Sequence, residues 1–100
     1  MGKSFVVSYQ MRPETADENQ RLIEDVFAEL AGASPDGLRY ASFRLADGVT
    51  FVHVGTVTDE ANPLAESAAF REFQRAFGDR AATPPKFEDA RLLGAYGFDT

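Results

Sequence analysis

The chain has 100 residues, of which 44% are hydrophobic and 26% are charged, the proportions of an ordinary globular domain. It contains no cysteine and one histidine, which excludes disulfides, zinc–thiolate sites and sites built from several histidines of one chain, so no metal is expected. The net charge of −6, with ten scattered basic residues, disfavours nucleic acid as a partner.

The first predicted element is a strand over residues 4–11, where successive side chains alternate between two faces. Pro13 ends this strand because proline cannot donate a hydrogen bond to the ladder. Thr15 and Glu18 then have the spacing of a capping box, which predicts the start of a helix. Gly32 is a natural end for that helix. Its buried face is marked by five apolar residues: Leu22, Ile23, Val26, Phe27 and Leu30.

A hairpin is predicted next. Residues 38–45 and 49–57 are rich in β-branched and aromatic side chains, which favour strands. Asp47 and Gly48 lie between them, and an Asp-Gly pair favours the positive φ angles of a tight turn. We therefore expect two antiparallel neighbours joined by a short loop.

A second helix is predicted over residues 59–79, ended by Gly78. Either Asn62, which precedes a proline, or Ser67 could cap its start, so a break near the middle of this segment is expected. The rigid "TPP" connector leads into a last strand, roughly over residues 86–98.

These elements follow in the order β-α-β-β-α-β, which predicts a ferredoxin-like α+β fold in a single domain over residues 1–100. Right-handed crossovers place both helices on one face of the antiparallel sheet. No apolar run reaches the roughly 18 residues that a membrane span needs. The first residues also lack the layout of a signal peptide. We therefore expect a cytoplasmic protein that does not bind membranes.

The other face of the sheet carries apolar residues as well: Val6 in the first strand, and Val52 and Val54 in the third. Two helices cover only one face, and an exposed apolar sheet face is a liability. We therefore predict a two-fold homodimer in which the two sheets pack together on this side. The alternative is that these valines only reflect strand propensity and stay half exposed.

The element order, the stretch "FVHVGTVTDEANPLAESAAFREFQRAF" and the closing "ARLLGAYGF" resemble the antibiotic-biosynthesis-monooxygenase-like family. The resemblance covers about residues 5–98. It implies a dimeric α/β barrel, formed by the sheets of two subunits, with a ligand pocket between the helices and the sheet of each. Members of this family include cofactor-independent monooxygenases of polycyclic aromatic phenols or quinols, and haem-degrading enzymes.

The chain departs from the family pattern at several positions. Family enzymes commonly carry a Glu and a Trp where the third strand ends; Gly55 and Val57 stand there, and the chain has no tryptophan. The haem-degrading members use a histidine on the second helix, which "SAAFREFQRAF" lacks. The oxygenases of the family also use an asparagine near the first strand, where this chain offers only Ser8 and Gln10. The resemblance therefore disfavours haem degradation, and no cofactor is expected.

His53 shares a strand face with Phe51, Gly55 and Val57, the side that the resemblance identifies as the pocket. A neutral imidazole there could act as a general base that removes a proton from a phenol, so that the electron-rich anion can react with oxygen. Its reference pKa of about 6.5 suits this role. The alternative is a buried structural histidine whose hydrogen bonds are satisfied by the protein.

Tyr40, Ser42 and Arg44 form a polar set on one face of the second strand. Tyr40 and Arg44 could orient the polar end of a substrate, Arg44 through paired hydrogen bonds to a carboxylate or enolate. The alternative is a solvated strand face, which is common for arginine. Tyr9 could line the pocket through its hydroxyl, although an aromatic residue on an alternating apolar face usually belongs to the core.

Several phenylalanines could form an apolar wall for a flat ligand, although residues with this helical spacing are usually core. They are Phe27, Phe51, Phe70, Phe73 and Phe77. The sequence thus leaves two functions open. One is a small-molecule enzyme, resembling cofactor-independent monooxygenases of an aromatic or quinol-type substrate, with His53 as the base. The other is a non-enzymatic homodimeric ligand-binding or interaction protein.

Overall fold

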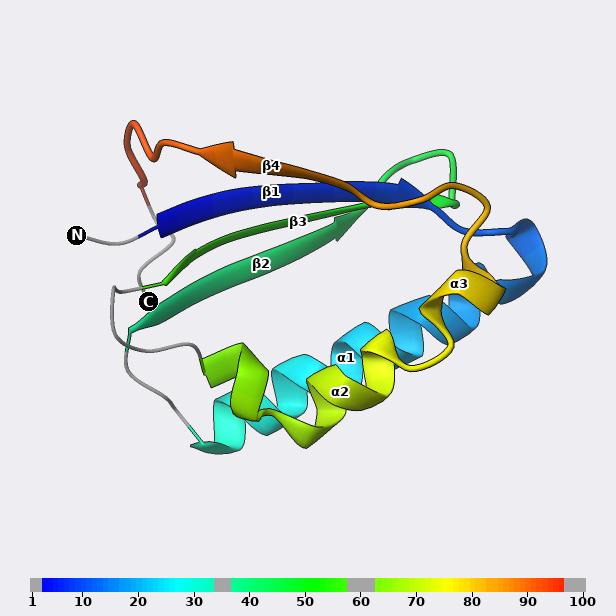
Figure 1. Ribbon diagram of the computed structural model, residues 1–100, viewed down its shortest axis with the longest axis horizontal. Helices are drawn as coiled ribbons and strands as arrows, with labels where there is room; N and C mark the ends of the chain where they lie inside the picture. The colour runs from blue at the N-terminus through cyan, green and yellow to red at the C-terminus, as the bar shows by residue number, and fades with distance from the viewer. Residues whose placement is uncertain (1–2, 34–36, 58–62, 97–100) are drawn as a thin grey trace.

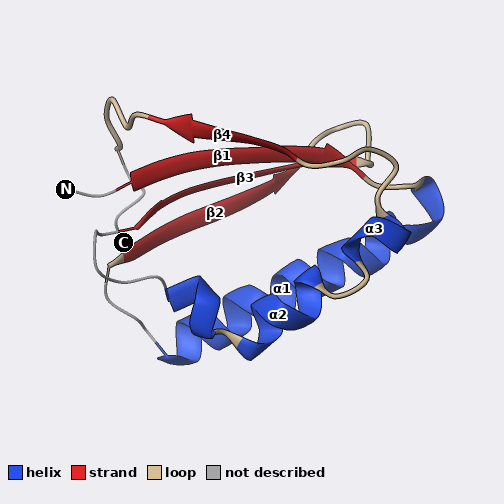
Figure 2. Ribbon diagram, in the orientation of Figure 1, coloured by secondary structure: helices blue, strands red, loops and turns tan. Residues whose placement is uncertain are grey.

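A computed structural model describes residues 3–33, 37–57 and 63–96. Four antiparallel strands form one sheet in the order β2-β3-β1-β4, and the helices lie together on one of its faces (Figure 1). Figure 2 shows the same two layers, with strands above and helices below. The predicted ferredoxin-like α+β fold is confirmed. Within the described residues, no helix is long and apolar enough to cross a membrane.

The first strand and helix lie close to their predicted positions. β1 (Lys3–Gln10) continues through a short 3-10 helix, η1 (Pro13–Thr15), into α1 (Ala16–Ala33). The Thr15 hydroxyl, expected to cap this helix, donates a hydrogen bond to the Arg80 carbonyl oxygen (2.8 Å). The prediction that Gly32 ends α1 is wrong, because that glycine lies within the last turn.

The predicted hairpin is confirmed, with β2 (Leu38–Arg44) and β3 (Thr50–Val57) paired antiparallel. Gly48 has the positive φ angle expected of the turn, +81°. The Asp47 carboxylate accepts hydrogen bonds from the Thr50 hydroxyl (2.6 Å) and from the backbone N–H groups of Thr50 and Val49 (both 2.9 Å). These bonds hold the pKa of Asp47 below its ordinary value.

The second helical segment is broken near its middle, as predicted. A 3-10 helix, η2 (Pro63–Glu66), precedes α2 (Ala68–Gln74). Ser67 caps α2, since its hydroxyl oxygen accepts a hydrogen bond from the Phe70 N–H at 3.0 Å. Asn62, the other predicted cap, lies outside the described residues.

A second break separates α2 from α3 (Phe77–Arg80), where Ala76 has a left-handed backbone with φ of 60°. The prediction that Gly78 ends this helical segment is wrong, because Gly78 lies inside α3. The last strand, β4 (Lys86–Ala90), is shorter than the predicted 86–98. The chain from 91 to 96 is not part of the sheet, and 97–98 lie outside the described residues.

The sheet has one face toward the helices and one face away from them. Phe51, His53 and Gly55 are buried beneath the helices, as the alternation of β3 predicted. Val52 and Val54 point to the opposite face and are half-buried, and Val54 pairs across the sheet with Val6. The next strand adds Phe43, paired with Val52 and 47% exposed. This outer face therefore carries an apolar patch that spans three strands, and the described residues leave the patch uncovered.

Candidate functional site

The buried His53 ring lies among three hydroxyl groups, of which that of Tyr9 is buried and those of Tyr40 and Ser42 are half-buried. Its Nε2 atom is 2.6 Å from the Tyr9 hydroxyl oxygen. Its Nδ1 atom is 2.7 Å from the Tyr40 hydroxyl and 2.7 Å from the Ser42 hydroxyl. Both ring nitrogens are therefore engaged by side chains of the protein.

The strand register brings this cluster together. Ser42 of β2 stands directly opposite His53 of β3, and Tyr40 lies two residues away on the same face of β2. On the other side of β3, Val7 of β1 faces His53, and Tyr9 follows two residues later. Because side chains alternate along each strand, the polar side chains of three adjacent strands lie on one face of the sheet and meet at one imidazole.

The cluster is uncharged at neutral pH. Burial lowers the pKa of His53 from 6.5 to about 4, well below the value expected for a general base near pH 7. Burial raises the pKa of Tyr40 to about 12, and raises the pKa of Tyr9 further. No carboxylate contributes to the pKa of His53. The site therefore offers neutral hydrogen-bonding groups rather than a ready proton acceptor.

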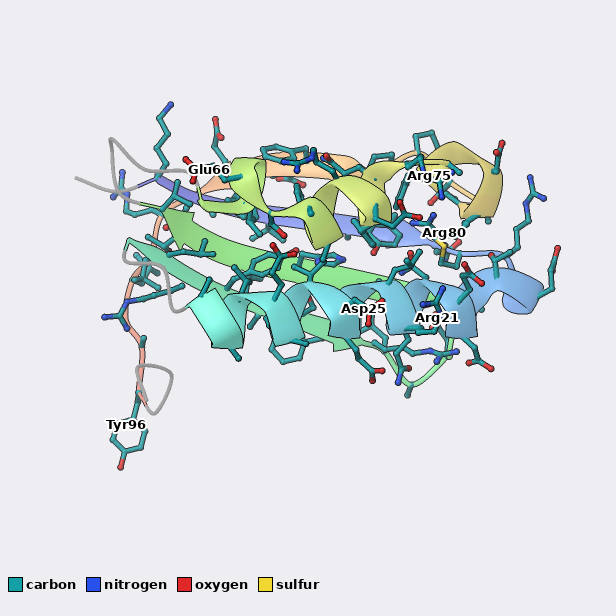
Figure 3. All side chains as sticks on the ribbon, turned by 90° about the horizontal axis from the view of Figure 1, so that it is seen from below. Arg21, Asp25, Glu66, Arg75, Arg80 and Tyr96 are labelled. Atoms are coloured by element: carbon teal, nitrogen blue, oxygen red, sulfur yellow. The ribbon has the colours of Figure 1, made fainter. Side chains whose placement is uncertain are left out.

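A second layer of polar side chains lies behind Tyr9. The Asn19 side chain is fully buried, and its Nδ2 atom donates a hydrogen bond to the Tyr9 hydroxyl oxygen (3.0 Å). Arg80 of α3 is also buried and donates to the Asn19 Oδ1 atom (3.4 Å) and to the Phe73 carbonyl oxygen (2.6 Å). Figure 3 shows Arg80 between α1 and the α2–α3 segment. A polar chain therefore runs from α3 through α1 to His53.

A cavity of about 730 Å³ lies between the sheet and the α2–α3 segment. The His53 ring is part of its lining, 5.7 Å from the Phe73 ring between centroids. Six further aromatic residues line it: Phe5, Tyr9, Tyr40, Phe70, Phe77 and Phe87. The volume and aromatic walls suit a flat ligand of two or three fused rings.

The structure brings most of the predicted site residues together. Besides His53, four of them line the cavity: Tyr9, Tyr40, Phe73 and Phe77. Phe51 and Arg44 are not among the described residues that line it. The Arg44 guanidinium lies over the Phe51 ring at 5.5 Å and donates hydrogen bonds to side chains of α1.

Asn19 and Arg80 were not predicted as site residues. Asn19 carried a signal in the sequence, because it lies three and four residues before Leu22 and Ile23 and so shares the apolar face of α1. Arg80 carried none, since its burial depends on the break before α3. Among the described residues, no group of His, Asp and Glu side chains is arranged to hold a metal ion.

Gly55 permits two rings to close over the sheet beside His53. It pairs with Phe5 on one side and Tyr40 on the other. A Cβ atom at this position would lie 2.5 Å from the Phe5 Cζ atom and 3.2 Å from the Tyr40 Cδ1 atom. A larger side chain here therefore requires both rings to move.

We expect Gly55→Ala to destabilise the protein by about 1–3 kcal/mol, because the added methyl group overpacks this part of the cavity wall. Urea unfolding measures the change. Gly32→Ala is the matched control, because a Cβ there meets nothing within 4 Å. Alanine in place of glycine in a helix should raise the free energy of unfolding by up to about 1 kcal/mol. Equal stability of the two variants would show that the Phe5 ring is not held over Gly55.

Comparison with known proteins identifies the fold. No family model matches the sequence, and no curated protein matches it significantly. Solved structures do match. A provisionally named antibiotic biosynthesis monooxygenase from Bacteroides thetaiotaomicron has a TM-score of 0.79 and 14% identity, with 99% of this chain and 95% of that chain covered.

Two structures from Nitrosomonas europaea are similar to the same degree. One, also provisionally named an antibiotic biosynthesis monooxygenase, has a TM-score of 0.76 and 16% identity, covering 96% of this chain and 94% of that one. The other, a protein of unknown function, has a TM-score of 0.73 and 20% identity over the same shares. The chain therefore has the α+β fold of the antibiotic-biosynthesis-monooxygenase-like proteins, as its sequence pattern indicated.

Proposed function

We propose that the protein is a small-molecule enzyme that oxygenates a flat phenolic or quinol-type substrate in this cavity without a cofactor. The observation that carries the proposal is the hydrogen-bonded cluster of Tyr9, His53 and Tyr40 in the wall of an aromatic cavity, with Ser42 behind it. Buried polar groups in an apolar pocket fix the orientation of a ligand. The shared fold with provisionally named monooxygenases supports the same assignment.

In this proposal the substrate ring lies against Phe73 and Phe77, with its oxygen atom at the Tyr40 hydroxyl. Loss of the phenolic proton leaves an electron-rich anion, which a hydrogen bond from Tyr40 stabilises. The anion forms a carbon–oxygen bond with O₂. One oxygen atom then stays on the ring carbon as a carbonyl, and the other leaves as water, so that the phenol becomes a quinone.

His53 acts here by holding the hydroxyl groups in place. With a pKa of about 4 and hydroxyls at both nitrogens, its imidazole is a weak and already occupied proton acceptor. The phenolic proton therefore leaves to solvent through the open side of the cavity. This changes the role expected from the sequence, from general base to a positioning residue for Tyr40.

The proposed active form is a homodimer joined through the outer faces of the two sheets. Val6, Val52 and Val54 lie at the centre of this face, with the exposed Phe43 beside them. The C-terminal segment supplies further exposed apolar side chains: Leu92 and Leu93 are 56% and 90% exposed. Figure 3 shows Tyr96 standing clear of the body of the chain. A second copy would cover both surfaces.

The alternative function is ligand binding without turnover. It is favoured by Gly55 and Val57, which stand where the family resemblance implied working Glu and Trp residues. The same cavity would then hold an aromatic molecule without activating it.

The test is product formation from a panel of naphthols and hydroxyanthracenes, with and without O₂. We expect a quinone only in air, and a decrease of about 10- to 100-fold in kcat/KM for Tyr40→Phe, because the donor to the anion is lost. Tyr96→Phe is the matched control, since it removes a hydroxyl from an exposed tyrosine outside the cavity. Saturable binding without product would favour the alternative, and absence of binding would contradict both.

A further inference from the structure

In the chain of hydrogen bonds from Arg80 through Asn19 to Tyr9, the chemistry of Arg80 determines which group donates and which accepts at each step. A guanidinium group only donates, so the Asn19 atom that faces it must be the amide oxygen. The Asn19 amide nitrogen therefore faces Tyr9 and donates to its hydroxyl oxygen at 3.0 Å. Arg80 thus orients Asn19 so that its N–H group donates to Tyr9.

This direction determines which nitrogen of His53 carries the proton. The Tyr9 oxygen accepts from Asn19, and the Tyr9 proton can bond to the His53 Nε2 atom at 2.6 Å. If Nε2 carried a proton instead, the Tyr9 oxygen would accept twice and its own proton would have no acceptor among the described residues. Leaving a buried donor unpaired is costly. The neutral ring therefore holds its proton on Nδ1.

The protons can then be counted on the other side of the ring. The Nδ1–H group donates to the Tyr40 and Ser42 hydroxyls, each at 2.7 Å. The two hydroxyls therefore keep their own protons, because the ring nitrogen beside them donates and does not accept. Tyr40 lines the cavity and Ser42 is not among the lining residues described, so the Tyr40 proton is available to a ligand.

We propose that the Arg80–Asn19–Tyr9 chain fixes His53 as the Nδ1–H tautomer, and that the cavity in consequence selects ligands with an acceptor oxygen at Tyr40. Ketones, quinones and phenolates fit this requirement, whereas donor-only molecules of the same shape do not. With the opposite tautomer, a bare Nδ1 would accept a proton from Tyr40 or Ser42, both 2.7 Å away, and would draw it away from the cavity. The ligand part of this inference rests on the proposed function.

The tautomer can be measured directly because His53 is the only histidine of the chain. A ¹⁵N–¹H NMR spectrum at pH 8 distinguishes the protonated ring nitrogen from the bare one without assignment of other residues. We expect Nδ1–H in the wild-type protein. Asn19→Asp replaces the amide donor with a carboxylate of the same shape, which still pairs with Arg80 but accepts the Tyr9 proton. It should therefore reverse the chain and give Nε2–H.

Two controls separate this effect from simple structural damage. Gln20→Glu makes the same amide-to-carboxylate change on α1 outside the chain, and should leave the tautomer unchanged. Tyr96→Phe should also leave it unchanged. An Nε2–H ring in the wild-type protein, or the same tautomer in wild type and Asn19→Asp, would overturn the inference.

Ligand selection is tested with three flat tricyclic probes of similar shape: 9-fluorenone, which only accepts, carbazole, which only donates, and fluorene, which does neither. We expect the wild-type protein to bind 9-fluorenone about 3- to 10-fold more tightly than carbazole, the effect of one buried hydrogen bond. Asn19→Asp should lose this preference. Equal affinities in the wild type would overturn the selection. Failure of all three to bind would contradict the proposed function, and the NMR spectrum would still decide the tautomer.

Discussion

Val54→Lys is expected to dissociate the proposed dimer into monomers. Val54 lies at the centre of the outer sheet face, between Val6 of β1 and Ala41 of β2. In a two-fold interface each substitution occurs twice, so two unpaired ammonium groups would be buried among apolar side chains. We expect the dissociation constant of the dimer to rise by about 100-fold or more, equivalent to about 3 kcal/mol. Size-exclusion chromatography with light scattering measures the change.

Ala28→Lys is the matched control for this prediction. Ala28 is exposed on α1, in the layer on the opposite side of the sheet, so the added charge should leave the dimer intact. Urea unfolding of both variants checks that the chain still folds. A wild-type protein that is monomeric at micromolar concentration would contradict the proposed dimer, as would a Val54→Lys variant that remains dimeric.

Lowering the pH from 7 to 4 is expected to cost about 3 kcal/mol of stability through His53 alone. Burial holds the pKa of His53 at about 4 in the folded protein, against an ordinary value of 6.5. The unfolded chain therefore binds this proton more tightly than the folded chain does. The contribution is fully present above pH 6.5 and is lost as the pH falls from 6.5 to 4.

Comparison with His53→Gln isolates this contribution from that of the carboxylates. Urea unfolding of both proteins at several pH values gives the difference in their free energies of unfolding. We expect the advantage of the wild type over His53→Gln to shrink by about 3 kcal/mol between pH 7 and pH 4. Parallel curves over this window would show that the imidazole is hydrated rather than buried among Tyr9, Tyr40 and Phe73.

Much of the fold could be predicted from the sequence because local signals agreed with the tertiary arrangement. The alternation in residues 49–57 placed His53 beneath the helices, and Asp47–Gly48 marked the hairpin turn. The second helical segment was harder. Its break at Ala76 requires a left-handed alanine, which no propensity predicts, so the sequence pattern places the helix end at Gly78 instead. Such a conformation is imposed by tertiary packing.

The candidate site was predictable only in part, because its chemistry depends on contacts between distant segments. The face of β3 identified His53, and the alternation of β2 placed Tyr40 and Ser42 together. The strand pattern could not show that Tyr9 bonds to His53, because this contact depends on which residues of β1 and β3 pair in the sheet. Nor could it show that Arg44 is held by α1 rather than by the cavity. The lowered pKa of His53 also follows from burial, which a single strand does not reveal.

The central claim is that the cavity binds a hydroxylated aromatic molecule with its oxygen at the Tyr40–His53 cluster. The most direct test is an anaerobic NMR titration of the wild-type protein with 2-naphthol, following the ring signals of its single histidine. We predict a saturable shift of the His53 signals, which Tyr40→Phe should reduce and Tyr96→Phe should not. His53 signals that stay unmoved up to the solubility limit of 2-naphthol would contradict the account.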